Sequence, residues 1–112
     1  MLPYSLRLRK NKEFKLTYEK GCLLKGEYLV LYYRKNDQEN SKFGFSISKK
    51  IGNAVVRNRI KRILRECCRI NRDKIVNGYN IIFVARSKIK GINYHLVEKE
   101  MLAMLEKAGL LR

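Results

Sequence analysis

The chain is short of carboxylates, with 10 Asp and Glu against 26 Lys and Arg in 112 residues and a formal net charge of +16. The ten acidic residues are scattered, whereas two-metal phosphoryl chemistry needs carboxylates that converge on one point. No Ser/His/Asp or Cys/His arrangement and no phosphate-binding glycine-rich loop is recognisable. We therefore predict no catalytic residue, no metal site and no cofactor bound by the protein itself.

Cysteine and histidine are also scarce. The three cysteines Cys22, Cys67 and Cys68 are odd in number and form no Cys-x-x-Cys pair, and His95 is the single histidine. This pattern excludes a disulfide framework and a zinc site of the usual spacing. A reduced, metal-free protein fits the composition.

Tryptophan is absent, and no apolar run is long enough to span a bilayer. The start Met1-Leu2-Pro3 does not resemble a signal peptide, and the chain has no repeat, low-complexity tract or Pro- or Gly-rich linker. We expect a cytoplasmic protein without a membrane partner, folded as one domain over residues 1–112.

The segment from Lys49 to Arg72 concentrates the positive charge, with nine basic residues and one acidic residue. Its apolar residues recur at the spacing of an α-helix that begins after Asn53, a residue type that caps helices. One stripe of this helix contains Val56, Ile60, Ile63, Leu64, Cys67 and Ile70. The face predicted to lie opposite contains Arg57, Asn58, Lys61, Arg62, Arg65 and Arg69.

A solvated surface helix is the alternative explanation for this charged face. Such faces mix signs to form stabilising pairs, yet Glu66 is the one acidic residue here. Arg57 and Arg59 also lie in the first turns, where the helix dipole disfavours cations. Clustered charge of one sign is typical of a nucleic-acid partner, and an anionic membrane is the less supported alternative.

Further elements are predicted on both sides of the basic helix. A first helix over residues 12–20, with Asn11 as N-cap and Gly21 at its end, places Phe14 and Tyr18 on one face. A last helix over residues 93–107 ends before Gly109. Strands are predicted at residues 22–25, 27–34, 42–48 and 79–85.

The strands over residues 27–34 and 42–48 are joined by the polar run 36–41, which predicts a hairpin. The almost wholly apolar strand 79–85 is expected at the centre of the sheet or covered on both sides. The order α-β-β-β-α-β-α predicts an α/β two-layer sandwich with a central mixed sheet.

The run from Lys49 to Arg62, KKIGNAVVRNRIKR, closely resembles the Arg-Asn-Arg signature of the bacterial ribonuclease P protein component. Further similarity lies in Arg7–Lys10 before the Phe14 helix with Gly21 at its end, and in Val30–Tyr32, Phe45–Ser48 and Ile81–Arg86. The alternative from residue chemistry alone is a ribosomal-type or other structural RNA- or DNA-binding protein without a processing role.

The resemblance implies a ribonucleoprotein endonuclease whose large RNA, with Mg²⁺, removes the 5′ leader from precursor tRNA. The protein is then a subunit that binds the catalytic RNA and the leader, needs no obligate protein partner, and is inactive by itself. The family fold also implies an unusual left-handed β-α-β crossover.

The resemblance assigns two sets of binding residues. Binding of the RNA subunit is implied for Lys49, Lys50, Asn53, Arg57, Asn58, Arg59, Lys61, Arg62 and Arg65. A cleft between the first helix and the sheet is implied to receive the single-stranded leader on Phe14, Tyr18 and Tyr32, with Lys12, Lys15 and Arg34 near its backbone. Aromatic rings stack on bases of any sequence, which suits a variable leader. The alternative is that these three rings are packing residues.

Overall fold

The structure, a computed structural model, describes residues 2–112. Its helices and strands follow the predicted order. They are α1 (Asn11–Lys20), β1 (Cys22–Lys25), β2 (Leu29–Lys35), β3 (Lys42–Ser46), α2 (Ala54–Ile70), β4 (Tyr79–Ala85) and α3 (Tyr94–Lys107). No helix within these residues is long and apolar enough to cross a membrane.

The four strands form one mixed sheet in the order β1-β2-β4-β3. β2 is antiparallel to both β1 and β4, whereas β3 runs parallel to β4. The predicted hairpin between the strands at 27–34 and 42–48 is therefore wrong, because β4 lies between them. The central position predicted for β4 is confirmed, and its residues Ile81, Ile82 and Phe83 are fully buried. Two paired edges and two covered faces explain why this strand is so apolar.

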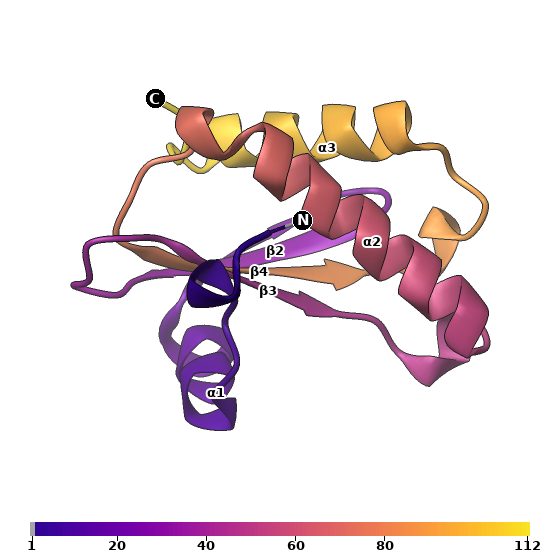
Figure 1. The fold of residues 1–112 in the computed structure, drawn as a ribbon, viewed down its shortest axis with the longest axis horizontal. Helices are drawn as coiled ribbons and strands as arrows, with labels where there is room; N and C mark the ends of the chain where they lie inside the picture. The colour runs from indigo at the N-terminus through magenta and orange to yellow at the C-terminus, as the bar shows by residue number, and fades with distance from the viewer. Residues whose placement is uncertain (1) are drawn as a thin grey trace.

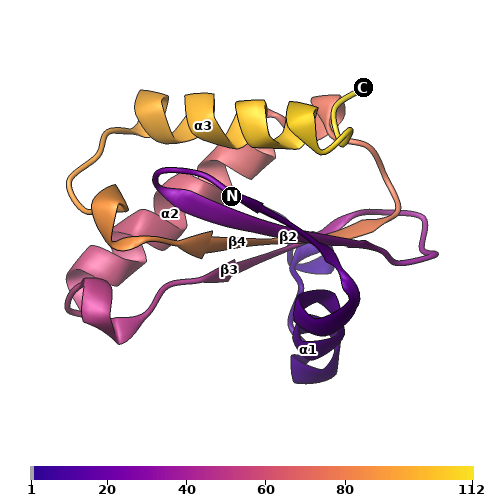
Figure 2. The same ribbon diagram turned by 180° about the vertical axis from the view of Figure 1, so that it is seen from behind.

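The helices lie on both faces of the sheet. α2 and α3 form a layer over one face, and α1 packs on part of the other (Figures 1 and 2). The predicted two-layer α/β sandwich is confirmed for the sheet with α2 and α3. Seen from the side of α2 with β3 and β4 pointing upward, β4 lies to the left of β3, so the β3-α2-β4 crossover is left-handed. Most crossovers have the opposite hand.

The main core lies between the sheet and the layer of α2 and α3. The alternation of β2 sends Leu29 and Leu31 into this core, while Val30 and Tyr32 face the side of α1. Leu64 of α2 and Met101 of α3 are fully buried opposite the sheet. Burying one such side chain contributes about 1.5–3 kcal/mol relative to leaving it exposed.

Helix ends agree with the sequence at most positions. The side-chain Oδ1 of Asn53 accepts a hydrogen bond from the Val56 amide at 3.0 Å and caps α2. Asn11 is not the predicted cap of α1, because the helix begins at Asn11 and its N-cap is Lys10, which makes no side-chain bond. Gly21 ends α1 as predicted, since a Cβ there would lie 2.4 Å from the Thr17 carbonyl oxygen.

Two apolar residues near helix ends are exposed, and one of them, Ile70, was predicted to lie on the apolar stripe of α2. Ile70 of α2 is 53% exposed and Leu96 of α3 is 43% exposed. Both lie in a terminal turn of their helix, where the neighbouring layer covers less of the side chain. Cys68, which was not predicted to lie on the apolar stripe of α2, is fully buried, and its Sγ lies 3.9 Å from the Met101 Sδ.

Residues 2–10, here called the N-terminal arm, pack along β3 and were assigned no element from the sequence. Leu2, Leu6 and Leu8 are buried, and the Leu8 amide donates to the Phe43 carbonyl at 2.7 Å. Arg7 forms an isolated parallel bridge with Phe43. The arm therefore adds one isolated bridge at the β3 edge of the sheet and brings its own cations beside α2.

Candidate nucleic-acid interface

The outer face of α2 carries cations without carboxylate partners. Asn58, Arg59 and Arg62 are exposed, and with Val55 they line a shallow depression along the helix. Within residues 2–112, the one ion pair joins Arg69 to Glu66. The remaining positive charge of this face is free to meet an anionic ligand.

A second row of α2 cations lies on the flank of the helix that faces β3. Arg57, Lys61 and Arg65 are half-buried, so the prediction that they lie opposite the apolar stripe is wrong. Residues four apart form one row on a helix, and this row borders the stripe. The Nε of Arg57 donates to the Gly52 carbonyl at 3.2 Å, which ties the helix to its entry loop.

The entry loop presents Lys49 and Lys50 in a short 3₁₀ turn over Lys49–Ile51. Both lysines are exposed, and the Lys50 amide donates to the Ser48 hydroxyl oxygen at 3.2 Å. Asn53 is exposed as well, but its side-chain oxygen already caps α2. The loop thus places two exposed cations beside the first turn of the helix.

The three aromatic residues predicted for the cleft are brought together from α1 and β2. The ring centroids of Phe14 and Tyr18 are 6.2 Å apart, and those of Tyr18 and Tyr32 are 4.8 Å apart with an interplanar angle of 89°. Tyr18 is 36% exposed, and the other two rings are half-buried. Partial burial raises the pKa of Tyr18 above the ordinary value of a tyrosine.

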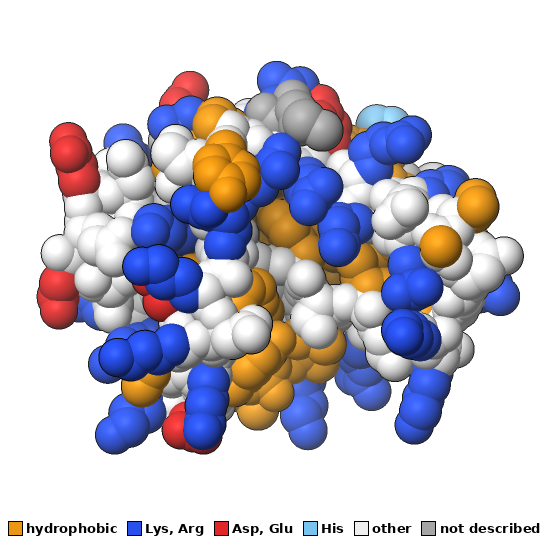
Figure 3. All heavy atoms as spheres, turned by 60° about the horizontal axis from the view of Figure 1, so that its bottom comes forward, with side chains coloured by type: hydrophobic (Ala, Val, Ile, Leu, Met, Phe, Trp, Pro, Cys, Tyr) orange, Lys and Arg blue, Asp and Glu red, His pale blue; other side chains and the backbone are white. Residues whose placement is uncertain are grey.

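The three rings, here called the aromatic cleft, lie on the face of the sheet against which α1 packs. Strand register sets Leu23, Tyr32, Ile82 and Gly44 side by side across the four strands. A Cβ on Gly44 would lie 2.6 Å from the Phe14 ring, so glycine is what lets this ring rest on β3. Figure 3 shows an apolar hollow on this side of the molecule, bordered by Lys and Arg side chains.

Three cations were predicted near the rings. Lys12 and Lys15 are exposed on α1, and Arg34 lies two residues beyond Tyr32 on the same face of β2. None of the three side chains has a hydrogen bond or ion pair within the described residues. They are available to an anionic strand, and their contact with a leader stays a prediction.

Sequence reasoning missed a cavity at the junction of the N-terminal arm with α1, β3 and α2. It encloses about 220 Å³. Its lining residues are Tyr4, Arg7, Leu8, Arg9, Phe14, Phe43, Gly44, Phe45, Lys61 and Arg65. The alternation of Leu6 and Leu8 with Arg7 and Arg9 was the available signal, since it is the pattern of a strand with one cationic face.

The best-placed carboxylates serve the fold. Glu98 accepts hydrogen bonds from the side chains of Asn71 and Tyr94, at 2.8 and 3.0 Å. Glu100 accepts the amides of Glu27, Tyr28 and Leu29 in the turn between β1 and β2. Within residues 2–112, no three His, Cys, Asp or Glu side chains are grouped so that they could hold a metal ion.

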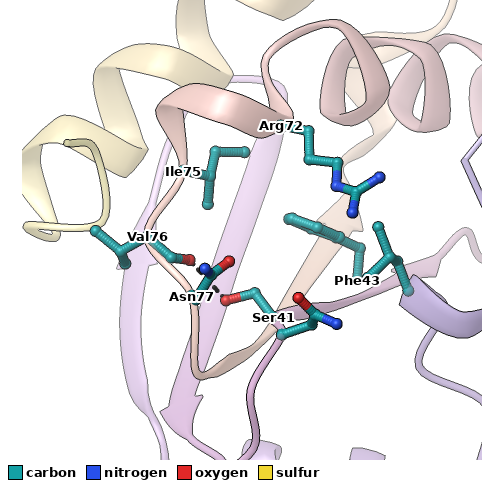
Figure 4. Close-up of a pocket in the computed structure, with 8 residues that line it drawn as sticks. Ser41, Phe43, Arg72, Ile75, Val76 and Asn77 are labelled. Carbon is teal, nitrogen blue, oxygen red and sulfur yellow. Dashed lines mark hydrogen bonds between the residues drawn. The ribbon is translucent and has the colours of Figure 1, made fainter.

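A small pocket near the start of β4 is also structural (Figure 4). It encloses about 10 Å³, room for one water molecule. The Ser41 hydroxyl donates to the Val76 carbonyl at 2.7 Å and accepts the Tyr79 amide at 3.0 Å. Ser41 thereby fixes the entry to β4.

The chain has a basic helix over one face of the sheet and an aromatic cleft on the other, and its sequence matches the model of a known family. The family model described as Ribonuclease P matches residues 2–109. The chain belongs to the ribonuclease P protein family. The ribonuclease P protein component of Syntrophomonas wolfei is 42% identical over 110 residues, covering 98% of this chain and 92% of that relative. That of Clostridium botulinum strain Eklund 17B is 44% identical over 111 residues, covering 93% and 89%.

Solved structures of the ribonuclease P family share the fold. The RNase P protein from Thermotoga maritima superposes with a TM-score of 0.84 at 32% identity, covering 90% of this chain and 96% of that one. The RNase P protein from Staphylococcus aureus gives a TM-score of 0.88 at 31% identity, covering 96% and 98%. The predicted resemblance and fold are therefore confirmed.

Membership of the ribonuclease P family gives the chain a subunit role in 5′ processing of tRNA, in association with an endoribonuclease complex that contains an RNA subunit. The alternative of a ribosomal-type or other structural nucleic-acid-binding protein is not favoured. The individual binding residues remain predictions.

Proposed function

We propose that the protein binds the catalytic RNA of ribonuclease P through α2 and its entry loop, and the 5′ leader of precursor tRNA through the aromatic cleft. The observation that carries this proposal is the separation of two different surfaces by one sheet. α2 lies over one face and α1 over part of the other (Figure 1), and the rings of α1 and β2 meet on the side of α1. We place this activity in the bacterial cytoplasm, where precursor tRNA is made.

The chemistry of each surface suits a different part of the RNA. The exposed guanidinium groups of Arg59 and Arg62 stand on a rigid 17-residue helix and suit the phosphates of a folded RNA. The rings of Tyr18 and Tyr32 offer partly exposed π-faces, which suit unpaired bases. A folded RNA subunit and a single-stranded leader fit these two surfaces respectively.

Cleavage itself is assigned to the RNA subunit with Mg²⁺. Two-metal phosphoryl chemistry needs converging carboxylates, and the donor set of this chain does not fit it. Glu98 and Glu100 are occupied by hydrogen bonds that hold the fold together. The protein contributes affinity and orientation for the precursor.

The test compares precursor and mature tRNA on reconstituted holoenzymes that carry Tyr18→Ala or Tyr32→Ala. Each change removes a stacking ring, so we expect precursor affinity to fall by about 1–3 kcal/mol per ring while mature tRNA affinity is unchanged. Tyr18→Phe and Tyr32→Phe keep the ring and serve as matched controls that retain precursor affinity. Thermal melting of each free protein is measured in parallel.

Equal losses for precursor and mature tRNA would contradict leader binding in the cleft. A fall in melting temperature large enough to explain the whole affinity loss would instead make these rings packing residues. Phe14 is left out of this test because it packs against Gly44, so its removal changes the fold as well.

A further inference from the structure

The cavity between the N-terminal arm and α2 collects positive charge from two elements distant in sequence. Arg7 and Arg9 come from the arm, and Lys61 and Arg65 come from α2. No Asp or Glu lines the cavity. The cavity encloses about 220 Å³, and no carboxylate balances its four cations. These cations therefore repel one another in the free protein.

Arg65 shows the local cost of this arrangement. Its Nε is the one buried side-chain nitrogen or oxygen in residues 2–112 that has no hydrogen-bond partner. Burial, with repulsion from Arg7 added to it, lowers the pKa of Arg65. Buried polar groups normally find a partner, so an unmatched guanidinium nitrogen beside a second cation requires an explanation.

Each cation of the arm makes a contact that orients its side chain. The Nε of Arg7 donates to the Leu2 carbonyl at 3.1 Å, and the following amide, that of Leu8, is bonded to β3. The guanidinium of Arg9 lies 3.7 Å from the centroid of the Tyr4 ring and donates to its hydroxyl. A preorganised set of donors loses little entropy when a ligand binds.

We propose that this cavity binds one phosphate group of RNA between Arg7 and Arg65, with Lys61 beside it. A phosphate supplies the missing negative charge and an acceptor for the unpartnered Arg65 Nε–H. The proposal rests on the proposed function. It adds the N-terminal arm to the proposed RNA-binding surface and assigns Arg65 to the side of α2 that faces the cavity.

The position of the cavity explains why a strand would reach it. Phe14 and Gly44 line the cavity and also belong to the aromatic cleft, so the two hollows adjoin. A leader that stacks on the rings passes the cavity with its backbone. The alternative source of the same chemistry is a phosphate of the RNA subunit held by the neighbouring face of α2.

The first experiment titrates inorganic phosphate into the free full-length protein at constant ionic strength, against chloride. The NMR resonance of the Arg65 Nε–H reports directly on the proposed contact. We expect this resonance to shift with phosphate, and Arg7→Met to weaken the response about tenfold, since a charge-assisted hydrogen bond is lost. Arg112→Met, which removes an exposed arginine from the C-terminus, is the matched control and leaves the response unchanged.

Arg65→Met supplies a second readout. It keeps most of the apolar stem but removes the unmatched donor and the repulsion with Arg7. We expect a melting temperature in phosphate-free buffer at or above that of the wild type. The proposal would be overturned if the Arg65 Nε–H resonance did not shift with phosphate. It would also be overturned if Arg112→Met weakened the phosphate response as much as Arg7→Met does.

The second experiment uses holoenzymes reconstituted with Arg7→Met or Arg65→Met and identifies the source of the phosphate. A roughly tenfold loss confined to precursor affinity supports a leader phosphate, and a similar loss in RNA-subunit affinity supports a phosphate of that RNA. If both variants keep the wild-type affinities for precursor tRNA and for the RNA subunit, and the wild-type protein assembles normally, the phosphate site is refuted and the proposed function stands. Failure of the wild-type protein to bind the RNA subunit would instead remove the proposed function.

Discussion

Single side chains decide how the aromatic cleft is shaped. Tyr18 and Tyr32 meet edge to face with centroids 4.8 Å apart, and both keep part of their surface exposed. Phe14 is different, because its ring lies on β3 where Gly44 has no side chain. One glycine therefore sets how closely α1 approaches the sheet, and with it the width of the cleft.

Gly44→Ala tests this at the residue scale. The new Cβ would lie 2.6 Å from the Phe14 ring, so the ring or α1 must move. We expect the free energy of unfolding to fall by about 1–3 kcal/mol, the usual cost of overpacking, together with weaker precursor binding. Urea denaturation and precursor affinity measure the two effects.

Adding Phe14→Leu to Gly44→Ala is the control for that clash. The smaller side chain relieves the contact, so the double variant recovers part of the stability that Gly44→Ala loses. A Gly44→Ala protein as stable as the wild type, or a double variant whose losses simply add, would show that Phe14 does not constrain this strand.

Among the elements, α2 carries core residues and exposed cations on separate rows. Leu64 and Cys67 are buried in the core, whereas Arg59 and Arg62 are exposed and make no hydrogen bond or ion pair within the described residues. Between them lies the half-buried row that includes Arg57, which also holds the entry loop. Substitutions on the exposed row therefore probe RNA binding without disturbing the core.

The double variant Arg59→Ala/Arg62→Ala tests the exposed row. Alanine favours the helix, so we expect an unchanged melting temperature. RNA-subunit affinity should fall by roughly 1 kcal/mol or more per lost phosphate contact at low salt, and the dependence of log affinity on log salt should flatten by about two units. Filter binding over a salt series measures both.

Lys99→Ala/Lys107→Ala on α3 removes the same number of exposed charges and is the matched control. It should reduce RNA-subunit affinity far less, because these lysines lie away from the predicted site. Equal losses from the two double variants would mean that net charge, and not the face of α2, determines RNA binding.

The molecule as a whole combines a net charge of +16 with carboxylates that have no common centre. Its excess charge favours association with a polyanion at a high rate. The helices that carry the two proposed binding surfaces, α2 and α1, lie on opposite sides of one sheet (Figures 1 and 2), an arrangement that suits simultaneous contact with two RNA segments. These properties suit a subunit that positions RNA.

The free protein should therefore show no nuclease activity on precursor tRNA, with or without Mg²⁺, because its acidic residues cannot hold a metal pair at the spacing of about 3.5–4 Å that such sites use. Cleavage should appear only after the RNA subunit is added. A nuclease-free preparation of the protein that cleaves precursor tRNA unaided, and loses this activity on Asp37→Ala or Glu39→Ala, would refute the assignment of catalysis to the RNA.

The amino-acid sequence by itself determined the features that depend on neighbours along the chain. The cap at Asn53, the end of α1 at Gly21 and the bounds of β4 all follow from local periodicity and residue type, and the structure confirms them. The Arg-Asn-Arg run identified the family for the same reason, since it is contiguous.

Tertiary structure decided what depends on contacts between distant segments. The pairing of β3 with β4 instead of the predicted hairpin with β2, and the packing of the arm along β3, could not be predicted because strand pairing is set by burial over the whole sheet. The environment of Arg65 depends likewise on Arg7, which lies 58 positions earlier in the chain. A helical wheel describes one helix, whereas the burial of a flanking side chain is decided by whichever element packs against that flank.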